Sequence, residues 1–217
     1  MERSAFLSRI SQAVSADTVP GHGAEHPEPT LPRLPEVDLT SHFIEAFEEL
    51  DGRVHHEPPV EVIAKIMADR GTDEYVAWDS EHLPTDGLLD ELTERGYRRV
   101  ETVLPSDPDG RIAHQMGYFD VGVGISAAVA VLAESGSVVV TSGPGRSRLA
   151  SVIPEVHVVL VPTNRMFRSL SHWAAQVESP HRLANIMVVS GPSRTGDIEL
   201  TLTRGVHGPG EVHAVLL

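Results

Sequence analysis

The chain has 217 residues, an apolar share of 41% and a formal net charge of −14 at pH 7. This length supports one large domain with a real core, and the negative charge argues against nucleic acid and anionic membranes as partners. Because the chain has no cysteine, disulfides, thiolate metal sites and cysteine-ligated iron–sulfur clusters are excluded, and we expect no cofactor and no metal in it.

The N-terminal part is expected to carry no targeting or membrane segment. No apolar run approaches the roughly 20 residues of a membrane helix, and the first residues lack the apolar region of a signal peptide. We therefore expect a cytoplasmic protein. Apolar periodicity predicts a helix over residues 3–15, and five prolines within residues 17–37 predict an extended linker. The expected organisation is an N-terminal helix (1–16), a linker (17–37) and an α/β domain (38–217).

Helices and strands alternate through the first half of that domain. Asp38 or Thr40 is expected to cap the first helix, and Pro58-Pro59 to open the second. The expected elements are helices over 41–51, 60–71 and around 88–92, with strands over 53–56, 75–78 and 97–100. His55 and His56 are neighbours on a strand and therefore point to opposite faces, which makes them a poor chelating pair.

The second half contains longer apolar runs. We expect Ser126 to cap a buried helix over 127–133, and a further helix over 165–177. Strands are expected over 138–141, 156–161, 186–189 and 212–217. These runs are apolar continuously rather than alternately, which is typical of strands buried on both faces of a parallel sheet. The sequence therefore predicts an α/β fold with a mostly parallel sheet flanked by helices.

Three polar loops follow three of these strands. The carboxyl ends of parallel strands lie at one edge of a sheet, where ligands bind, so Arg146 or Arg148, Arg165 and Arg194 are expected to face one cleft. The stretch Ser190–Glu199 is expected to begin a helix whose free N–H groups join them in holding a carboxylate or phosphate. Plain turns and surface charges are the alternative interpretation. The expected ligand-binding residues are Ser142, Arg148, Ser190, Ser193, Arg194, Thr195 and Glu199.

Three residues are candidates for acid–base work. Glu134 is expected at the end of the buried helix, where apolar surroundings raise the pKa of a carboxyl group. Asp197 and His207 are the other two candidates. The alternatives are a solvated Glu134, an Asp197 that only complements a helix dipole, and a His207 bonded to backbone in a turn. His157, within an apolar strand, is interpreted as a hydrogen-bonded core histidine.

Four blocks of the second half form a recognisable set. They are Ala133-Glu134-Ser135-Gly136-Ser137, Arg148-Leu149 with Pro154 and His157 through Pro162, Ser190 through Glu199, and Gly205-Val206-His207-Gly208-Pro209. Together they resemble the LutC/YkgG lactate-utilisation family, whose members carry the LUD domain, and the resemblance covers about residues 121–217. Ser135 and Ser137 stand where the family usually has Thr, and Gly196 stands where it commonly has Ala.

The resemblance implies a fold like that of the NagB/RpiA/CoA-transferase group. It also implies a role in oxidising L-lactate to pyruvate beside two partner proteins that carry iron–sulfur clusters. Under this hypothesis the chain is a non-redox subunit that binds a small carboxylate or phosphate. Two alternatives stay open. One is a stand-alone transferase or isomerase acting on a CoA-linked or phosphorylated substrate, with Glu134 as nucleophile or base. The other is an interaction module whose acidic first half docks a basic partner.

Overall fold

A computed structural model describes residues 3–16, 38–103, 105–177, 184–196 and 202–217. The chain divides into a unit over residues 1–32 and a unit over residues 33–217. The first unit contains α1 (Arg3–Ala16), which confirms the helix expected over 3–15 and exposes Phe6 and Leu7. The expected linker, residues 17–37, lies outside the described residues, and the domain boundaries stay a prediction.

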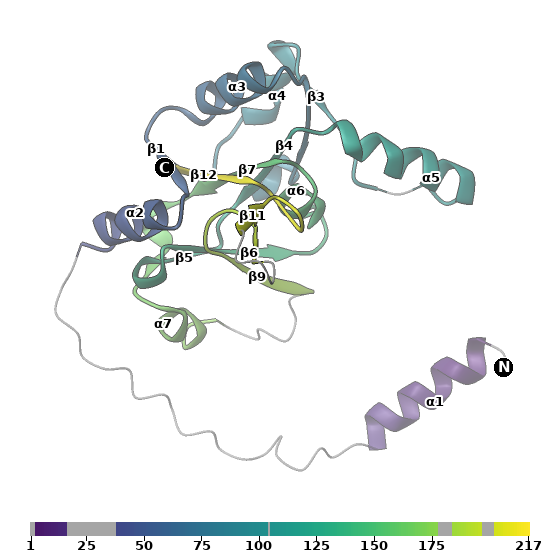
Figure 1. The fold of residues 1–217 in the computed structure, drawn as a ribbon. Helices are drawn as coiled ribbons and strands as arrows, with labels where there is room; N and C mark the ends of the chain where they lie inside the picture. Colours follow the sequence, from purple (N-terminus) through teal and green to yellow (C-terminus); the bar gives the residue numbers. More distant parts are fainter. Residues whose placement is uncertain (1–2, 17–37, 104, 178–183, 197–201) are drawn as a thin grey trace. The chain divides into compact units, whose positions relative to one another are not determined.

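The second unit is built on a six-stranded sheet in which every neighbouring pair is parallel (Figure 1). This confirms the α/β class with a mostly parallel sheet. Across the sheet the order is β1 (Arg53–His55), β12 (Glu211–Leu216), β7 (Val156–Val161), β4 (Val123–Ala127), β2 (Glu74–Ala77) and β3 (Arg98–Arg99). The central strands β4 and β7 are buried along their whole length, as their apolar runs predict.

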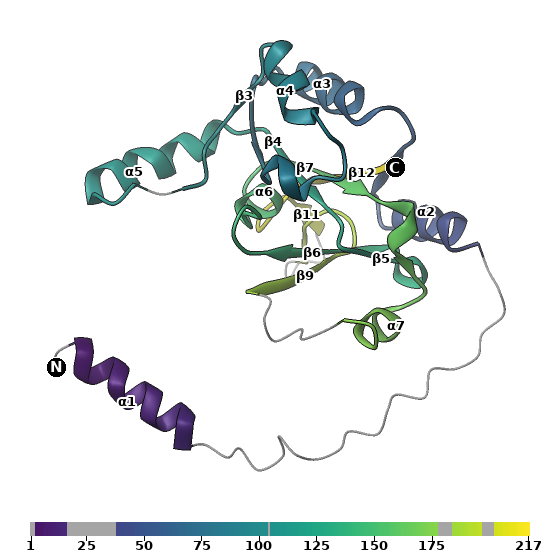
Figure 2. The ribbon, with the colours of Figure 1, turned by 180° about the vertical axis from the view of Figure 1, so that it is seen from behind.

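Helices cover the sheet on both faces, as the two opposite views show (Figures 1 and 2). One face carries α3 (Pro59–Arg70) and α4 (Leu88–Glu94), and the other carries α6 (Leu149–Val152). The strand β4 approaches α6 so closely that a Cβ atom added to Gly124 would lie 1.8 Å from the carbonyl oxygen of Ala150. Glycine at position 124 therefore allows α6 to pack this closely against β4.

The ends of several helices follow the expected local chemistry. Asp38 caps α2 (Leu39–Glu49) by accepting a hydrogen bond from the amide of Thr40 at 3.0 Å. Pro59 opens α3, and Gly71 ends it with a left-handed φ of 65°. The helix α5 (Pro108–Met116) was not anticipated. No helix among the described residues has the length and hydropathy needed to cross a membrane.

A second sheet of four strands corrects two expectations. Its order is β8 (Met166–Phe167), β5 (Ala130–Leu132), β6 (Ser137–Ser142) and β9 (Asn185–Val189). The strands β6 and β9 pair antiparallel, so the expected parallel arrangement of 138–141 and 186–189 is wrong. The helix expected over 127–133 is also wrong, because those residues end β4 and form β5. A short run that is apolar on all sides fits a buried strand as well as a buried helix.

Two further expected helices differ from the structure. Instead of one helix over 165–177, the chain forms the short 3₁₀ turn η4 (Thr163–Arg165), β8 and α7 (Leu170–Ala174). After Gly191, whose φ is 93°, the chain forms a hairpin of β10 (Arg194–Gly196) and β11 (Leu202–Arg204). There is therefore no helix N-terminus in the described part of Ser190–Glu199, and the backbone N–H groups of Thr195 and its neighbours serve strand pairing instead.

Candidate functional site

A cleft of about 230 Å³ lies at the carboxyl ends of β2, β4 and β7. Open parallel sheets bind ligands at this edge because loops diverge there and leave a crevice. Trp78 follows β2, Ala128 follows Ala127 at the end of β4, and Pro162 follows β7. The rest of the lining is polar at Glu81, His82, Arg146 and Arg165 and apolar at Leu83, Pro84 and Val129.

The loop that carries Arg146 is held against the cleft by backbone contacts. The amide of Asp79 donates to the carbonyl of Gly145 at 2.8 Å, and Nε2 of His82 lies 3.1 Å from the carbonyl oxygen of Pro144. Because a carbonyl only accepts, His82 carries its proton on Nε2 here. The loop therefore leaves β6 in the second sheet and docks on the 3₁₀ turn η1 (Ser80–His82) beside the first sheet.

Donors outnumber acceptors in this cleft. Arg146 donates from Nη1 to the hydroxyl of Thr141 at 3.1 Å, and neither Arg146 nor Arg165 forms an ion pair with a described residue. The indole N–H of Trp78 and Nε of Arg146 are buried and have no acceptor in the described part of the chain. Glu81 stands at the rim, where its side chain is 76% exposed. Two guanidinium groups and a spare indole N–H favour an anion.

The structure brings together only part of the predicted arginine cluster. Arg146 and Arg165 share the cleft, as expected. Arg194 does not, because its Nη2 donates to the carbonyl of Leu50 and to Asp51, both at 2.6 Å. Arg148 lines a different groove beside β9. The prediction that all three loops meet at one edge is wrong, because the loop after β9, a strand of the second sheet, lies away from the cleft, whereas the loop after β6 reaches it.

Three predicted residues from the sequence blocks 190–199 and 205–209 do lie together, at a different place in the fold. Ser190, Ser193 and His207 line a cavity of about 190 Å³ whose wall includes His157. The two loops are tied together, since the amide of Ser193 donates to the carbonyl of Pro209 at 2.8 Å. Among the described residues, no lysine or arginine lines this cavity, so none of them supplies the positive charge that an anion site needs.

His157 is a core histidine, as the sequence analysis predicted. It is fully buried, and its Nε2 lies 2.7 Å from the hydroxyl of Ser126. Burial, with a smaller contribution from His213, lowers the pKa of His157 to about 4. The imidazole is therefore neutral at pH 7. Ser126, expected to cap a helix, lies on β4 and is instead the partner of this histidine.

The remaining predicted site residues do not assemble. Glu134 lies in the 3₁₀ turn η3 (Ala133–Ser135), is 47% exposed at its side chain and pairs with Nε of Arg168 at 2.6 Å, so the buried helix end expected for it is wrong. Thr195 lies in β10 opposite Thr203, and Ser142 ends β6 opposite Asn185. Asp197 and Glu199 lie outside the described residues.

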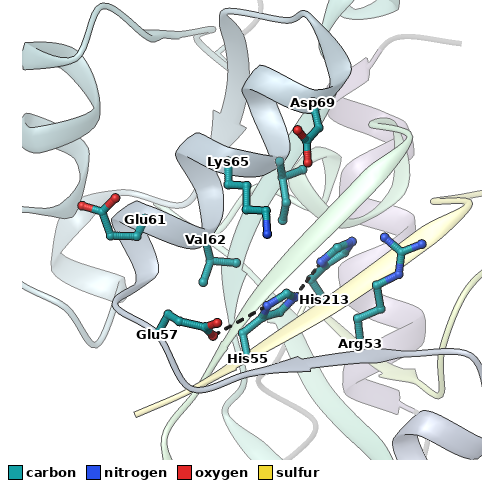
Figure 3. Close-up of a pocket in the computed structure, with 9 residues that line it drawn as sticks. Arg53, His55, Glu57, Glu61, Val62, Lys65, Asp69 and His213 are labelled. Carbon is teal, nitrogen blue, oxygen red and sulfur yellow. Dashed lines mark hydrogen bonds and ion pairs between the residues drawn. The ribbon is translucent and has the colours of Figure 1, made fainter.

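A histidine pair that sequence reasoning missed lines another cavity, of about 260 Å³, between α3 and the β1 edge of the sheet (Figure 3). His55 and His213 come from β1 and β12, and 158 positions separate them in the chain. The only sequence signal was the pair His55-His56, which pointed to the wrong neighbour. Among the described residues, no group of three or more His, Asp or Glu side chains is arranged to hold a metal ion.

A family model of the LUD domain matches residues 41–217 of this chain. The chain belongs to the LUD domain family. This LUD domain is 31% identical over 156 residues to lactate utilization protein C of Geobacillus sp. (strain WCH70), with 69% of this chain and 64% of the relative covered. It is 38% identical over 154 residues to lactate utilization protein C of Halalkalibacterium halodurans, with the same shares covered. The chain thus spans less than two thirds of the length of these relatives.

The fold has a solved counterpart. A crystal structure of a DUF162 family protein from Deinococcus radiodurans superposes with a TM-score of 0.52, covering 85% of this LUD domain chain and 99% of the other. The sequence identity is 14%. At that level the likeness concerns the fold alone.

Proposed function

We propose that this LUD-domain protein is a non-redox subunit of a lactate-oxidising system and binds a small anion between Arg146 and Arg165. The names of relatives at 31% and 38% identity support the link to lactate. Partner proteins with iron–sulfur clusters would carry the electrons, since this chain has no cysteine to hold such a cluster. The ligand is a carboxylate or a phosphate, and L-lactate and pyruvate both carry the carboxylate.

One observation carries the ligand part of the proposal. Arg146 and Arg165 line the carboxyl edge of a parallel sheet, and no described carboxylate pairs with either of them. A guanidinium that meets a carboxylate in a crevice forms a short, charge-assisted hydrogen bond. The buried indole N–H of Trp78 would gain an acceptor from the same ligand. An anion therefore satisfies both the charge and the unpaired donors of this cleft.

A binding panel tests the anion site. Thermal unfolding of the full chain is measured with acetate, L-lactate, pyruvate and phosphate, in the wild type and in R165M and R146M. A ligand at 100 times its Kd should stabilise the wild type by about 2.7 kcal/mol, and either variant should lose most of that effect. R194M is the matched control, because Arg194 is already paired with Asp51. The site is ruled out if R165M and R146M respond to every anion as the wild type does.

A separate experiment tests the partners. The tagged full chain is purified from cells grown on L-lactate, and the eluate is examined for iron, labile sulfide and the visible absorbance of iron–sulfur clusters. Stoichiometric recovery of cluster-containing proteins supports the subunit role. Recovery of the chain alone, together with normal growth on L-lactate after deletion of its gene, would overturn it.

The geometry gives no support to a stand-alone transferase or isomerase based on Glu134. Its carboxylate is 2.6 Å from Nε of Arg168 and lies at a half-exposed turn. A carboxylate nucleophile or base must be free to contact the reacting atom of its substrate. Glu134 has instead a guanidinium partner, and this ion pair occupies the carboxylate that would have to contact a substrate.

A further inference from the structure

His55 and His213 line the cavity between α3 and the sheet edge and contact each other there (Figure 3), and a chain of hydrogen bonds runs from His55 through His213 to Glu211. Nε2 of His55 lies 2.9 Å from Nδ1 of His213, and Nε2 of His213 lies 3.3 Å from Oε2 of Glu211. The planes of the two imidazole rings are nearly parallel, with an interplanar angle of 7°. Val62 and Ile66 of α3 form the apolar wall of the same cavity.

Glu211, at the other end of this hydrogen-bond chain, has an ionised carboxyl group. Arg53 and Arg70 contact its two oxygens at 2.8 Å and 2.5 Å. Burial opposes ionisation of Glu211, but the hydrogen bond from His213 and the charges of Arg70 and Arg53 outweigh it, so the pKa of Glu211 is lowered. At neutral pH this carboxylate only accepts hydrogen bonds.

The ionised carboxylate of Glu211 determines which ring nitrogens of His213 and His55 carry protons. Burial lowers the pKa of His213 to about 4 and also lowers the pKa of His55, so both imidazoles are neutral at pH 7. His213 must carry its proton on Nε2 to donate to Glu211, which leaves its Nδ1 as an acceptor. His55 must then donate from Nε2. The Nδ1 atom of His55 is therefore an unprotonated acceptor.

A cation stands opposite this acceptor. Lys65, the single lysine of the chain, extends from α3 into the cavity toward the two histidines (Figure 3). It forms no ion pair within the described part of the chain. Of the carboxylates around the cavity, Glu61 pairs with Arg95 at 2.5 Å, while Glu57 lies 4.0 Å from Nδ1 of His55 and Asp69 lies farther along α3.

We propose that this cavity binds small carboxylic acids that carry a hydrogen-bond donor on the carbon next to the carboxylate. The carboxylate of such a 2-hydroxy or 2-amino acid meets the ammonium group of Lys65, and its O–H or N–H donates to Nδ1 of His55. A 2-keto acid offers only acceptors at that carbon. It would leave Nδ1 of His55 facing another lone pair, so the site discriminates against it.

The discrimination should be measurable. Losing one hydrogen bond and leaving a partly buried acceptor unpaired corresponds to roughly 10- to 100-fold in Kd. L-Lactate or L-alanine should therefore bind at least about 10-fold more tightly here than pyruvate. This site shares no residue with the Arg146–Arg165 cleft, so it stands or fails independently of the anion site proposed there.

Imidazole NMR of the full chain at pH 7.5 tests the proposal with L-lactate, L-alanine, pyruvate and acetate as probes. Comparison with H55Q and H213Q identifies the two sets of resonances. In the free protein, the ¹⁵N shifts should show both rings protonated on Nε2 and not on Nδ1. L-Lactate or L-alanine should shift the His55 signals saturably, and the tighter of the two decides between hydroxyl and amino donors.

Variants outside the hydrogen-bond chain make the test specific. K65M changes an exposed helix position, should remain folded, and should weaken the response of His55 at least about 10-fold. R165M should leave that response unchanged. The proposal is overturned if His55 is protonated on Nδ1, if pyruvate shifts His55 as strongly as L-lactate and L-alanine, if no acid shifts it, or if K65M binds like the wild type.

Discussion

Nε2 of His55 lies 2.9 Å from Nδ1 of His213, and this contact joins the edge strand β1 to β12 on the face that α3 covers. The strand β1 contains three residues, so side-chain contacts add substantially to its backbone pairing. The contact requires at least one neutral ring, because two imidazolium groups would repel each other and neither would accept a hydrogen bond.

Acid should destabilise the fold before its carboxylates titrate. The pKa values of His157 and His213 are lowered to about 4 in the folded state, against about 6.5 in an unfolded chain. Between those values the unfolded state binds more protons, so the free energy of unfolding falls as the pH decreases. Between pH 7.5 and pH 5 each histidine should remove about 2 kcal/mol. Urea unfolding at a series of pH values measures this.

Two variants test whether the buried histidines cause this loss of unfolding free energy. H213Q should have a shallower dependence on pH between 7.5 and 5 than the wild type. The exposed H207Q should follow the wild type, because His207 lies in an open turn. A wild-type unfolding free energy that stays constant over this range would contradict the neutral state of the buried histidines.

Adding a single methyl group at Gly124 should destabilise the protein. A Cβ atom there would lie 1.8 Å from the carbonyl oxygen of Ala150, which is backbone and cannot rotate away. Overpacking of this kind costs about 1–3 kcal/mol or more. G124A should therefore unfold at lower urea concentration, whereas G117A, where a Cβ meets nothing within 4 Å, should change little. Equal midpoints for G124A and the wild type would show that α6 does not pack on β4 in this way.

Removing the hydroxyl of Ser126 should cost more than removing an exposed hydroxyl. Ser126 is the hydrogen-bond partner of the buried His157, and S126A would leave the imidazole without that partner. An unsatisfied buried polar group costs about 1–3 kcal/mol. S190A, whose hydroxyl is exposed and bonds to Ser137 at 2.7 Å, should cost about 0.5 kcal/mol or less. Denaturant unfolding at pH 7.5 compares them, and a reversed order would contradict the buried pair.

Anion binding should depend on Arg165 and not on Arg194. Loss of a charge-assisted hydrogen bond corresponds to about 1.5–3 kcal/mol, so R165M should weaken acetate or phosphate binding roughly 10- to 100-fold. R194M removes contacts to Leu50 and Asp51 and should alter stability without altering binding. Isothermal titration calorimetry at low and high salt separates the effects, since added salt weakens an exposed ionic contact. Stronger dependence on Arg194 than on Arg165 would reject the cleft.

The amino-acid sequence by itself determined the elements that local chemistry controls. The cap at Asp38, the helix opened by Pro59, and the buried strands over 156–161 and 212–217 are all present. Apolar runs of that length and composition are buried whatever surrounds them, so they can be recognised without knowledge of their partners. The order of the diagnostic blocks likewise identified the family that the domain model then confirmed.

Only the tertiary structure decided which strand pairs with which, and therefore where the sites lie. An apolar run indicates that a strand is buried but indicates neither its direction nor its neighbour in the sheet. The runs of β6 and β9 therefore resembled strands of the parallel sheet, although these two strands belong to the second sheet. That difference separates Arg194 from Arg165. It is also why His55 and His213, 158 positions apart, could not be recognised as a pair. Their contact exists because β12 lies between β7 and β1, a pairing set by long-range packing rather than by local propensity.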